Sequence, residues 1–136
     1  GTDGTLLPAL TLDATLSQHL GVAAVPERVD PDTWTLDQHW LDLPGRSQIM
    51  LDLLYDYRSN IALYPQWQAW LRAYRPPLLL PWGRNDRFFP EVGARAYLAD
   101  IPDAELHLFD GGHFLLDEQV ESVAGLIRDF IQRHAR

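Results

Sequence analysis

Cysteine is absent from the 136-residue chain, so the chain itself supplies no disulfide bond, thiolate zinc site or cysteine nucleophile. Long hydrophobic runs are also lacking, because no apolar stretch approaches the ~20 residues that a membrane-spanning helix needs. These absences predict a soluble, cytoplasmic protein that has no membrane partner.

Positive charge is scarce as well. The eleven basic residues, all arginine, are outnumbered by nineteen acidic residues, and the formal net charge is -8. Nucleic acids and anionic membranes bind clustered basic side chains, so neither is an expected partner. The remaining composition, 46% hydrophobic and 22% charged, is typical of one ordinary globular domain.

The chain begins at Gly1, and its only methionine is Met50. No positively charged start is followed by an apolar core, so Gly1 is not expected to open a signal peptide. We therefore interpret the sequence as a fragment or a processed piece of a longer protein.

Residues 30–75 are predicted to form a helical, aromatic-rich block. Asp30 followed by a proline is typical of a helix N-cap, and Pro44-Gly45 is typical of a helix stop. Apolar residues then recur at helical spacing in two further segments. The second of these follows Ser59-Asn60 and has Pro65 near its start.

Residues 76–136 are predicted to form strand, helix, strand and helix. Short apolar runs mark the strands, and Pro81 is expected to end the first strand early because proline cannot donate to a sheet ladder. The final helix is predicted to start near Asp117 and to carry an apolar stripe. Strands that alternate with helices imply parallel pairing, and two such strands alone leave edges and faces open. The pattern therefore predicts part of a larger α/β domain.

Asp86 and His113 follow the two predicted strands and are the candidate catalytic residues. In open α/β sheets, functional groups gather beyond the carboxyl ends of the strands. A carboxylate that accepts from one imidazole nitrogen fixes the tautomer and leaves the other nitrogen to take a proton from a nucleophile or water. Gly111 and Gly112 would allow the tight turn that brings His113 inward. Alone, Asp86 could instead cap a turn, and His113 could be a structural histidine.

The sequence around these residues resembles the C-terminal end of α/β-hydrolase-fold enzymes. The resemblance is carried by Trp82-Gly83-Arg84-Asn85-Asp86-Arg87-Phe88-Phe89-Pro90, by Pro102-Asp103-Ala104-Glu105-Leu106-His107 and by Gly112-His113-Phe114. It implies an α/β fold in which residues 1–75 form a helical cap and residues 76–136 form the last strand-helix-strand-helix part of the core.

By this resemblance Asp86 matches the acid, and His113 the histidine, of a nucleophile-histidine-acid triad. The Gly-His-Phe form favours the epoxide hydrolase and haloalkane dehalogenase branch, whose nucleophile is an aspartate, over ester hydrolases, whose nucleophile is usually serine. The resemblance implies a small apolar substrate and no cofactor or metal.

The nucleophile of such a triad is missing from the chain. None of Ser17, Ser47, Ser59 and Ser122 has the Gly-x-Ser-x-Gly context of a nucleophile elbow, and no His-Gly oxyanion-hole loop is present. The expected partner is therefore the N-terminal half of the fold, on sequence outside this chain, or a second copy of the chain that completes the sheet.

Several other residues have a functional and a structural interpretation. Asp30, Asp32, Asp37 and His39 suggest a metal site, but the calcium-loop pattern lacks its central glycine and terminal glutamate, and helix capping explains these residues better. The histidines in helical segments are interpreted as surface residues: His19, His39 and His134.

Aromatic residues at helical spacing in the cap region either pack in the core or line a substrate pocket. We predict that Tyr57, Tyr64 and Trp67 bind substrate. Two functions remain open. The chain is either the acid-and-histidine portion of a hydrolase, inactive without its missing half, or a non-enzymatic truncated or interaction module that self-association could complete.

Overall fold

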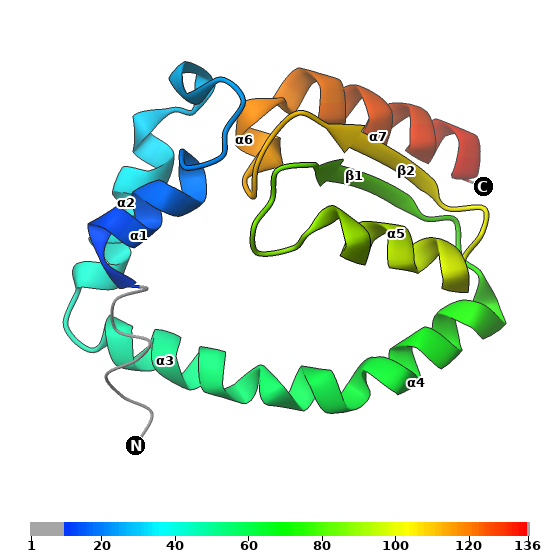
Figure 1. Cartoon of the computed structure of the whole chain (residues 1–136), viewed down its shortest axis with the longest axis horizontal. Helices are drawn as coiled ribbons and strands as arrows, with labels where there is room; N and C mark the ends of the chain where they lie inside the picture. The colour runs from blue at the N-terminus through cyan, green and yellow to red at the C-terminus, as the bar shows by residue number, and fades with distance from the viewer. Residues whose placement is uncertain (1–9, 136) are drawn as a thin grey trace.

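The computed structural model describes residues 10–135. Gly1 and the rest of the first nine residues of the predicted cap lie outside the described residues. The elements follow in the order α1 (Leu12–His19), a short 3-10 helix η2 (Pro26–Arg28), α2 (Pro31–Asp42), α3 (Arg46–Asp56), α4 (Arg58–Tyr74), β1 (Leu79–Gly83), α5 (Glu91–Asp100), β2 (Glu105–Phe109), α6 (Leu115–Glu118) and α7 (Val120–His134) (Figure 1). No helix of the described part is long and apolar enough to span a membrane.

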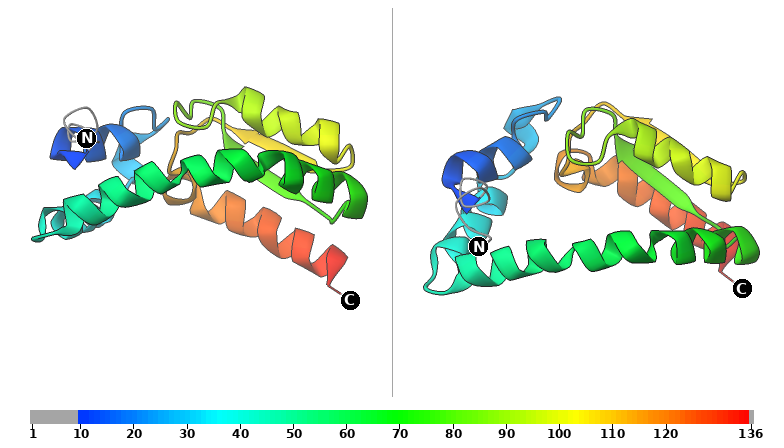
Figure 2. Two further views of the ribbon diagram at one scale, coloured as in Figure 1. Left: turned by 90° about the horizontal axis from the view of Figure 1, so that it is seen from below. Right: turned by 60° about the horizontal axis from the view of Figure 1, so that its bottom comes forward.

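The sheet consists of β1 and β2, which pair in parallel from Leu79 opposite Glu105 to Gly83 opposite Phe109. Helix α5 connects the strands along one face of the sheet, and α7 covers the opposite face (Figure 2). The predicted strand-helix-strand-helix order and the parallel pairing are therefore confirmed.

Pro81 does not end the first strand, as the sequence predicted, because β1 continues through it to Gly83. The amide of Glu105 donates to the carbonyl of Leu78, and the amide of Arg84 donates to that of Phe109. Backbone groups of alternate residues point to the same side of a strand, so position 81 points away from β2. The missing N–H of the proline therefore costs no bond in this ladder.

Helices α3 and α4 form one nearly continuous rod along the side opposite the sheet (Figure 1). Tyr57 ends α3 and starts α4 with helical dihedral angles, so the break predicted at Ser59-Asn60 is wrong. Pro65 lies inside α4 rather than near its start. A proline removes only one intrahelical hydrogen bond, which a long helix tolerates at some loss of stability. By contrast, the cap predicted at Asp30 is confirmed, because its carboxylate accepts from the amide of Asp32 at 3.0 Å.

The last helix is divided in two, whereas the sequence predicted one helix from about Asp117. Gln119 separates α6 from α7 with non-helical dihedral angles, φ -136° and ψ 42°. Its side-chain amide donates to the carbonyl of Asp110 at 2.7 Å, which ties the break to the loop after β2. A contact with a residue nine positions earlier in the chain thus accompanies the end of α6.

The core is small and lies around the sheet. Leu80, Ala94, Ile101 and Val123 are buried there, with Val123 only 1% exposed. The predicted apolar stripe of α7 is only partly covered, since Ile131 on the same helix is 55% exposed. The sheet is too narrow to cover the whole apolar face of this helix.

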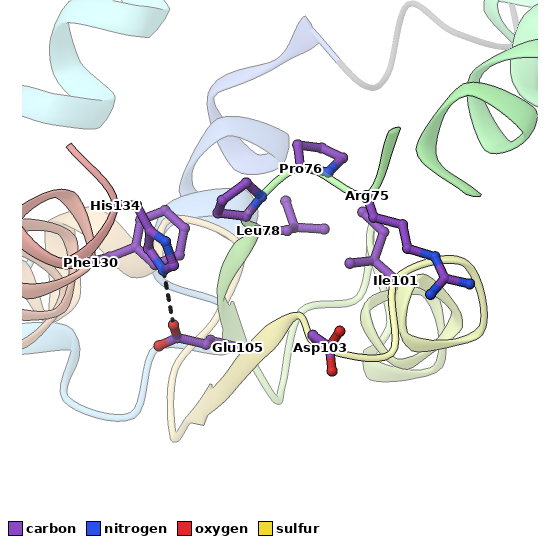
Figure 3. Close-up of a pocket in the computed structure, with 9 residues that line it drawn as sticks. Arg75, Pro76, Leu78, Ile101, Asp103, Glu105, Phe130 and His134 are labelled. Carbon is purple, nitrogen blue, oxygen red and sulfur yellow. Dashed lines mark ion pairs between the residues drawn. The ribbon is translucent and has the colours of Figure 1, made fainter. Parts of the chain in front are cut away.

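An ion pair holds the end of α7 to the start of β2. Arg133 donates from both terminal nitrogens to the carboxylate of Glu105, at 2.6 and 2.7 Å. His134 lies beside the same carboxylate, 3.7 Å away (Figure 3). Glu105 and His134 border a cavity of about 200 Å³ at the amino-terminal ends of the strands, opposite to the edge that carries Asp86 and His113.

The hydrogen bonds from Arg133 lower the pKa of Glu105 below its ordinary value of 4.5. Because the folded-state pKa is the lower one, the pair stabilises the fold fully above pH 4.5 and less as the pH falls through the folded-state value. We expect Arg133→Gln to return the pKa of Glu105, measured by NMR titration, toward 4.5. Arg128→Gln, on the exposed side of the same helix, is the control. A Glu105 pKa that Arg133→Gln leaves unchanged would contradict this assignment.

Candidate active site

The parallel strands bring Asp86 and His113 to the same edge of the sheet. Asp86 lies in the loop that follows β1, and His113 lies in the loop that follows β2. The two loops are bonded to each other, because the amide of Asn85 donates to the carbonyl of Gly111 at 3.0 Å. The Asn85 side chain adds a second bond, to the carboxylate of Asp110 at 2.9 Å. The backbone therefore sets the distance between the two candidate residues.

Asp86 is fixed by three contacts. Its Oδ1 accepts from the amides of Phe88 and Phe89, at 2.8 and 2.9 Å, and its Oδ2 lies 3.0 Å from Nδ1 of His113. The Asp86 side chain is 7% exposed and that of His113 is 23% exposed. An ionised carboxylate only accepts hydrogen bonds, so Nδ1 carries the proton and Nε2 is left as the nitrogen that can take one. The pair can therefore work as an oriented general base.

Close approach of the two loops requires glycine at position 83. A Cβ at this position would overlap the carbonyl oxygen of Gly112 and would lie 2.8 Å from that of Gly111. The end of β1 thus packs directly against the backbone that leads into His113, and no side chain fits between them.

Three aromatic rings surround the imidazole of His113. Its ring centroid lies 4.8 Å from that of Phe88, 5.3 Å from that of Phe89 and 5.1 Å from that of Phe114. Apolar neighbours lower the local dielectric and so strengthen the hydrogen bond between an imidazole and a carboxylate.

A cavity of about 610 Å³ opens beside Phe88 and Phe89. Tyr57, Tyr64 and Trp67, the three predicted substrate-binding residues, all line it. Tyr57 and helix α4 thus supply one wall, and the loop of Asp86 together with α5 supplies the other. The structure brings the predicted residues together, and their role in binding remains a prediction.

The tyrosines of this cavity are bonded to each other, with 2.7 Å between the hydroxyl oxygens of Tyr57 and Tyr64. This hydrogen bond raises the pKa of Tyr64 above its ordinary value of 10.0. Tyr64 therefore keeps its proton at neutral pH, and the pair places hydroxyl groups on an otherwise aromatic wall.

His19 is buried, so its interpretation as a surface residue is wrong. It is 3% exposed, its Nε2 lies 3.1 Å from a carboxylate oxygen of Asp37, and its ring stacks on Phe114 at 3.8 Å. Asp37 therefore binds His19 and does not cap a helix. The helical spacing that located both residues could not reveal this contact, because the partners of His19 lie on α2 and in the loop of His113.

Glu118 is a second buried residue that sequence reasoning missed, and it is 6% exposed. The sequence predicts it only as an acid in the first turn of the helix that starts near Asp117. The carboxylate of Glu118 instead accepts from two backbone amides, those of Gly112 and Ala24.

No group of three or more histidine, aspartate or glutamate residues in the described part of the chain is arranged to hold a metal ion. Of the acids that suggested a calcium loop, Asp30 caps α2 and Asp37 binds His19. His39 and His134 are exposed, as predicted.

Comparison with known proteins finds relatives that are named hydrolases. The chain is 42% identical to an uncharacterized hydrolase of Saccharomyces cerevisiae over 106 residues. The matched residues make up 78% of this chain and 36% of the yeast protein. It is 37% identical over 75 residues to a 2-hydroxy-6-oxononadienedioate/2-hydroxy-6-oxononatrienedioate hydrolase of Pseudomonas putida, which is 54% of this chain and 26% of that enzyme.

A third relative is a poly(3-hydroxyalkanoate) depolymerase of Ectopseudomonas oleovorans, 36% identical over 64 residues, or 47% of this chain and 23% of the depolymerase. No family model and no solved structure matches the chain. The chain spans about a third of the yeast relative and about a quarter of the other two. The relatives are hydrolases of the α/β-hydrolase family, and the chain is homologous to a portion of each of them.

Proposed function

We propose that this chain supplies the acid and the histidine of a nucleophile-histidine-acid triad, in an α/β-hydrolase that acts on a small apolar molecule. The observation that carries the proposal is the 3.0 Å contact between Nδ1 of His113 and Asp86, beyond the carboxyl ends of two parallel strands. Homology to named hydrolases supports the reaction class.

In this mechanism, Asp86 orients the imidazole and stabilises the positive charge that develops on it. Nε2 of His113 then takes a proton either from a serine nucleophile or from the water that cleaves an ester formed on an aspartate. Two backbone amides donate to the other oxygen of Asp86 and hold its carboxylate in place beside the imidazole. The same two residues serve either nucleophile.

The nucleophile and the oxyanion donors are proposed to lie on a segment outside this chain. All four serines sit within helices, in α1, α3, α4 and α7, and none follows a strand as a nucleophile elbow does. None of these serines therefore occupies the strand-to-helix turn from which a serine nucleophile would face His113.

The large exposed surface of the chain supports the proposal that a further segment packs against it. Its accessible surface is 9382 Å², whereas a self-contained monomer of 15.5 kDa exposes about 7,200 Å². Apolar side chains that a larger sheet would cover are exposed on α7, and β1 has an open edge. We propose that the N-terminal part of an α/β-hydrolase fold covers these surfaces. A second copy of the chain is the alternative, which a monomeric species in analytical ultracentrifugation would rule out.

The cavity beside Phe88 and Phe89 is the proposed substrate site, with Tyr57, Tyr64 and Trp67 on its wall. Aromatic walls bind an apolar substrate, and the paired hydroxyl groups can hold one polar atom of it. One relative is named a depolymerase of a poly(3-hydroxyalkanoate), which is a polyester. Acyl transfer to a serine is therefore the alternative to the aspartate chemistry that Gly-His-Phe favours.

We expect the isolated chain to show no saturable hydrolysis of aryl esters or epoxides. The nucleophile and the oxyanion donors are proposed to lie outside this chain, and an oriented base without them does not lower the barrier to hydrolysis. The measurement is initial rate against substrate concentration, with His113→Gln as the matched variant. Saturable turnover that disappears in His113→Gln would show that the chain is a complete catalyst and would overturn this part of the proposal.

A further inference from the structure

The backbone that leads into His113 is held by a side chain from outside the proposed triad. Oε1 of Glu118 accepts from the amide of Gly112 at 2.7 Å, and Oε2 accepts from the amide of Ala24 at 3.0 Å. One buried carboxylate thus joins the loop of His113 to the segment between α1 and η2.

The fit around this carboxylate is tight at both glycines of the loop. A Cβ on Gly111 would lie 3.2 Å from Oε2 of Glu118, and one on Gly112 would lie 3.2 Å from Oε1 and 2.7 Å from Val22. The two glycines therefore do more than allow a turn, because they let Glu118 reach the backbone directly.

Gly111 and Gly112 are held from two directions. The amide of Asn85, next to Asp86, donates to the carbonyl of Gly111, and Glu118 accepts from the amide of Gly112. Phe114, on the far side of His113, stacks on the buried ring of His19 at 3.8 Å. The residues on both sides of His113 are therefore fixed, Gly112 by Glu118 and Phe114 by His19.

We propose that Glu118 is a positioning residue, whose two amide contacts hold the backbone of His113 where its Nδ1 meets Asp86. A general base has to be held within about half an ångström of its working geometry, and a buried carboxylate with two strong acceptor bonds can do this. The catalytic meaning of the contact rests on the proposed function. The contact itself, and its effect on the His113–Asp86 bond, do not depend on that function.

The test uses NMR of the whole 136-residue chain and the variant Glu118→Gln. The glutamine has nearly the same shape, but its amide nitrogen cannot accept a hydrogen bond, so one of the two clamped amides is released. We expect the Gly112 or Ala24 amide to exchange with solvent about tenfold faster or more. We also expect the Nδ1–H signal of His113 to be lost and its ring ¹⁵N shifts to move toward a mixture of tautomers.

Two controls separate positioning from general stability. Leu115→Ala removes a buried apolar side chain from the same short helix and leaves Glu118 in place, while Glu121→Gln changes an exposed acid on α7. Both are expected to keep the Nδ1–H signal while the chain is folded. The proposal is overturned if Glu118→Gln keeps this signal and the tautomer, or if Leu115→Ala loses them to the same extent.

A measurement on the unmodified chain decides the matter if Glu118→Gln does not fold. If Glu118 holds both backbone segments, the amides of Gly112 and Ala24 are protected from exchange with solvent. They also exchange through the same local unfolding event that exposes the Nδ1–H of His113. A freely exchanging Gly112 amide in the folded chain would refute the clamp. These readouts need no turnover, so failure of the clamp and failure of the proposed hydrolase function are distinguishable.

Discussion

Replacing His113 by glutamine is expected to lower kcat at least about 10³-fold in a complete enzyme that contains this chain. Glutamine cannot take a proton from a nucleophile or water, and the bond to Asp86 would no longer orient a base. Asp86→Asn should have an effect of the same order, because an amide that donates to Nδ1 favours the wrong imidazole tautomer. Both losses should fall on kcat more than on KM, since neither side chain lies on the aromatic wall that is proposed to bind substrate.

The measurement needs a segment that supplies the nucleophile. We suggest a chimera in which this chain replaces the matching region of the yeast relative, to which it is 42% identical over 106 residues. Initial rates are compared on aryl esters and epoxides after circular dichroism has shown that each variant is folded. His107→Gln is the matched control, because His107 lies on β2 near Glu105 and has no contact with Asp86. A His113→Gln chimera as active as the control would remove His113 from the mechanism.

The two catalytic candidates could be predicted because parallel strands direct their carboxyl ends to the same edge. Each residue follows a short apolar run, and once the runs pair, the distance between their loops is fixed. Nothing in this inference needed a side-chain contact. The same holds for the cap at Asp30, which depends on the residues next to it and on no distant element.

The burial of His19 and of Glu118, which the sequence did not reveal, depends on contacts between distant segments. His19 is buried because Asp37 and Phe114 close over it, and helical periodicity records only that it lies on a helix. Glu118 reads as an acid in a first helical turn until Ala24 and Gly112 are placed beside it. Local patterns indicate which face of an element is apolar and leave open which polar side chains are drawn into the fold.

Pro81 illustrates a different error, because the rule against proline in a strand was applied without knowing which way its missing N–H would face. Proline is excluded from a strand only where its missing N–H would face a partner, and that direction depends on the register with β2. The sequence does not fix this register. Here position 81 points to the open edge of β1, so the strand continues.

Gly83→Ala is expected to destabilise the chain by about 2 kcal/mol or more, a large effect for one methyl group. The new Cβ would overlap the carbonyl oxygen of Gly112 and would meet that of Gly111, and both are backbone atoms that cannot rotate away. Relief requires the two loops to separate, which lengthens the distance between Asp86 and His113. We therefore expect a lower urea midpoint and, in the variant that remains folded, loss of the Nδ1–H signal of His113.

Gly125→Ala is the matched control, because it adds the same methyl group to α7 where no atom lies within 4 Å of the new Cβ. In a helix interior, alanine is favoured over glycine by up to ~1 kcal/mol, so this variant should be as stable as the unmodified chain or more so. If Gly83→Ala unfolds at the urea midpoint of the Gly125→Ala chain, the backbone at position 83 is not in close contact with Gly112. The spacing of Asp86 and His113 would then depend on the bond between Asn85 and Gly111 and on Glu118 far more than on the glycine at the end of β1.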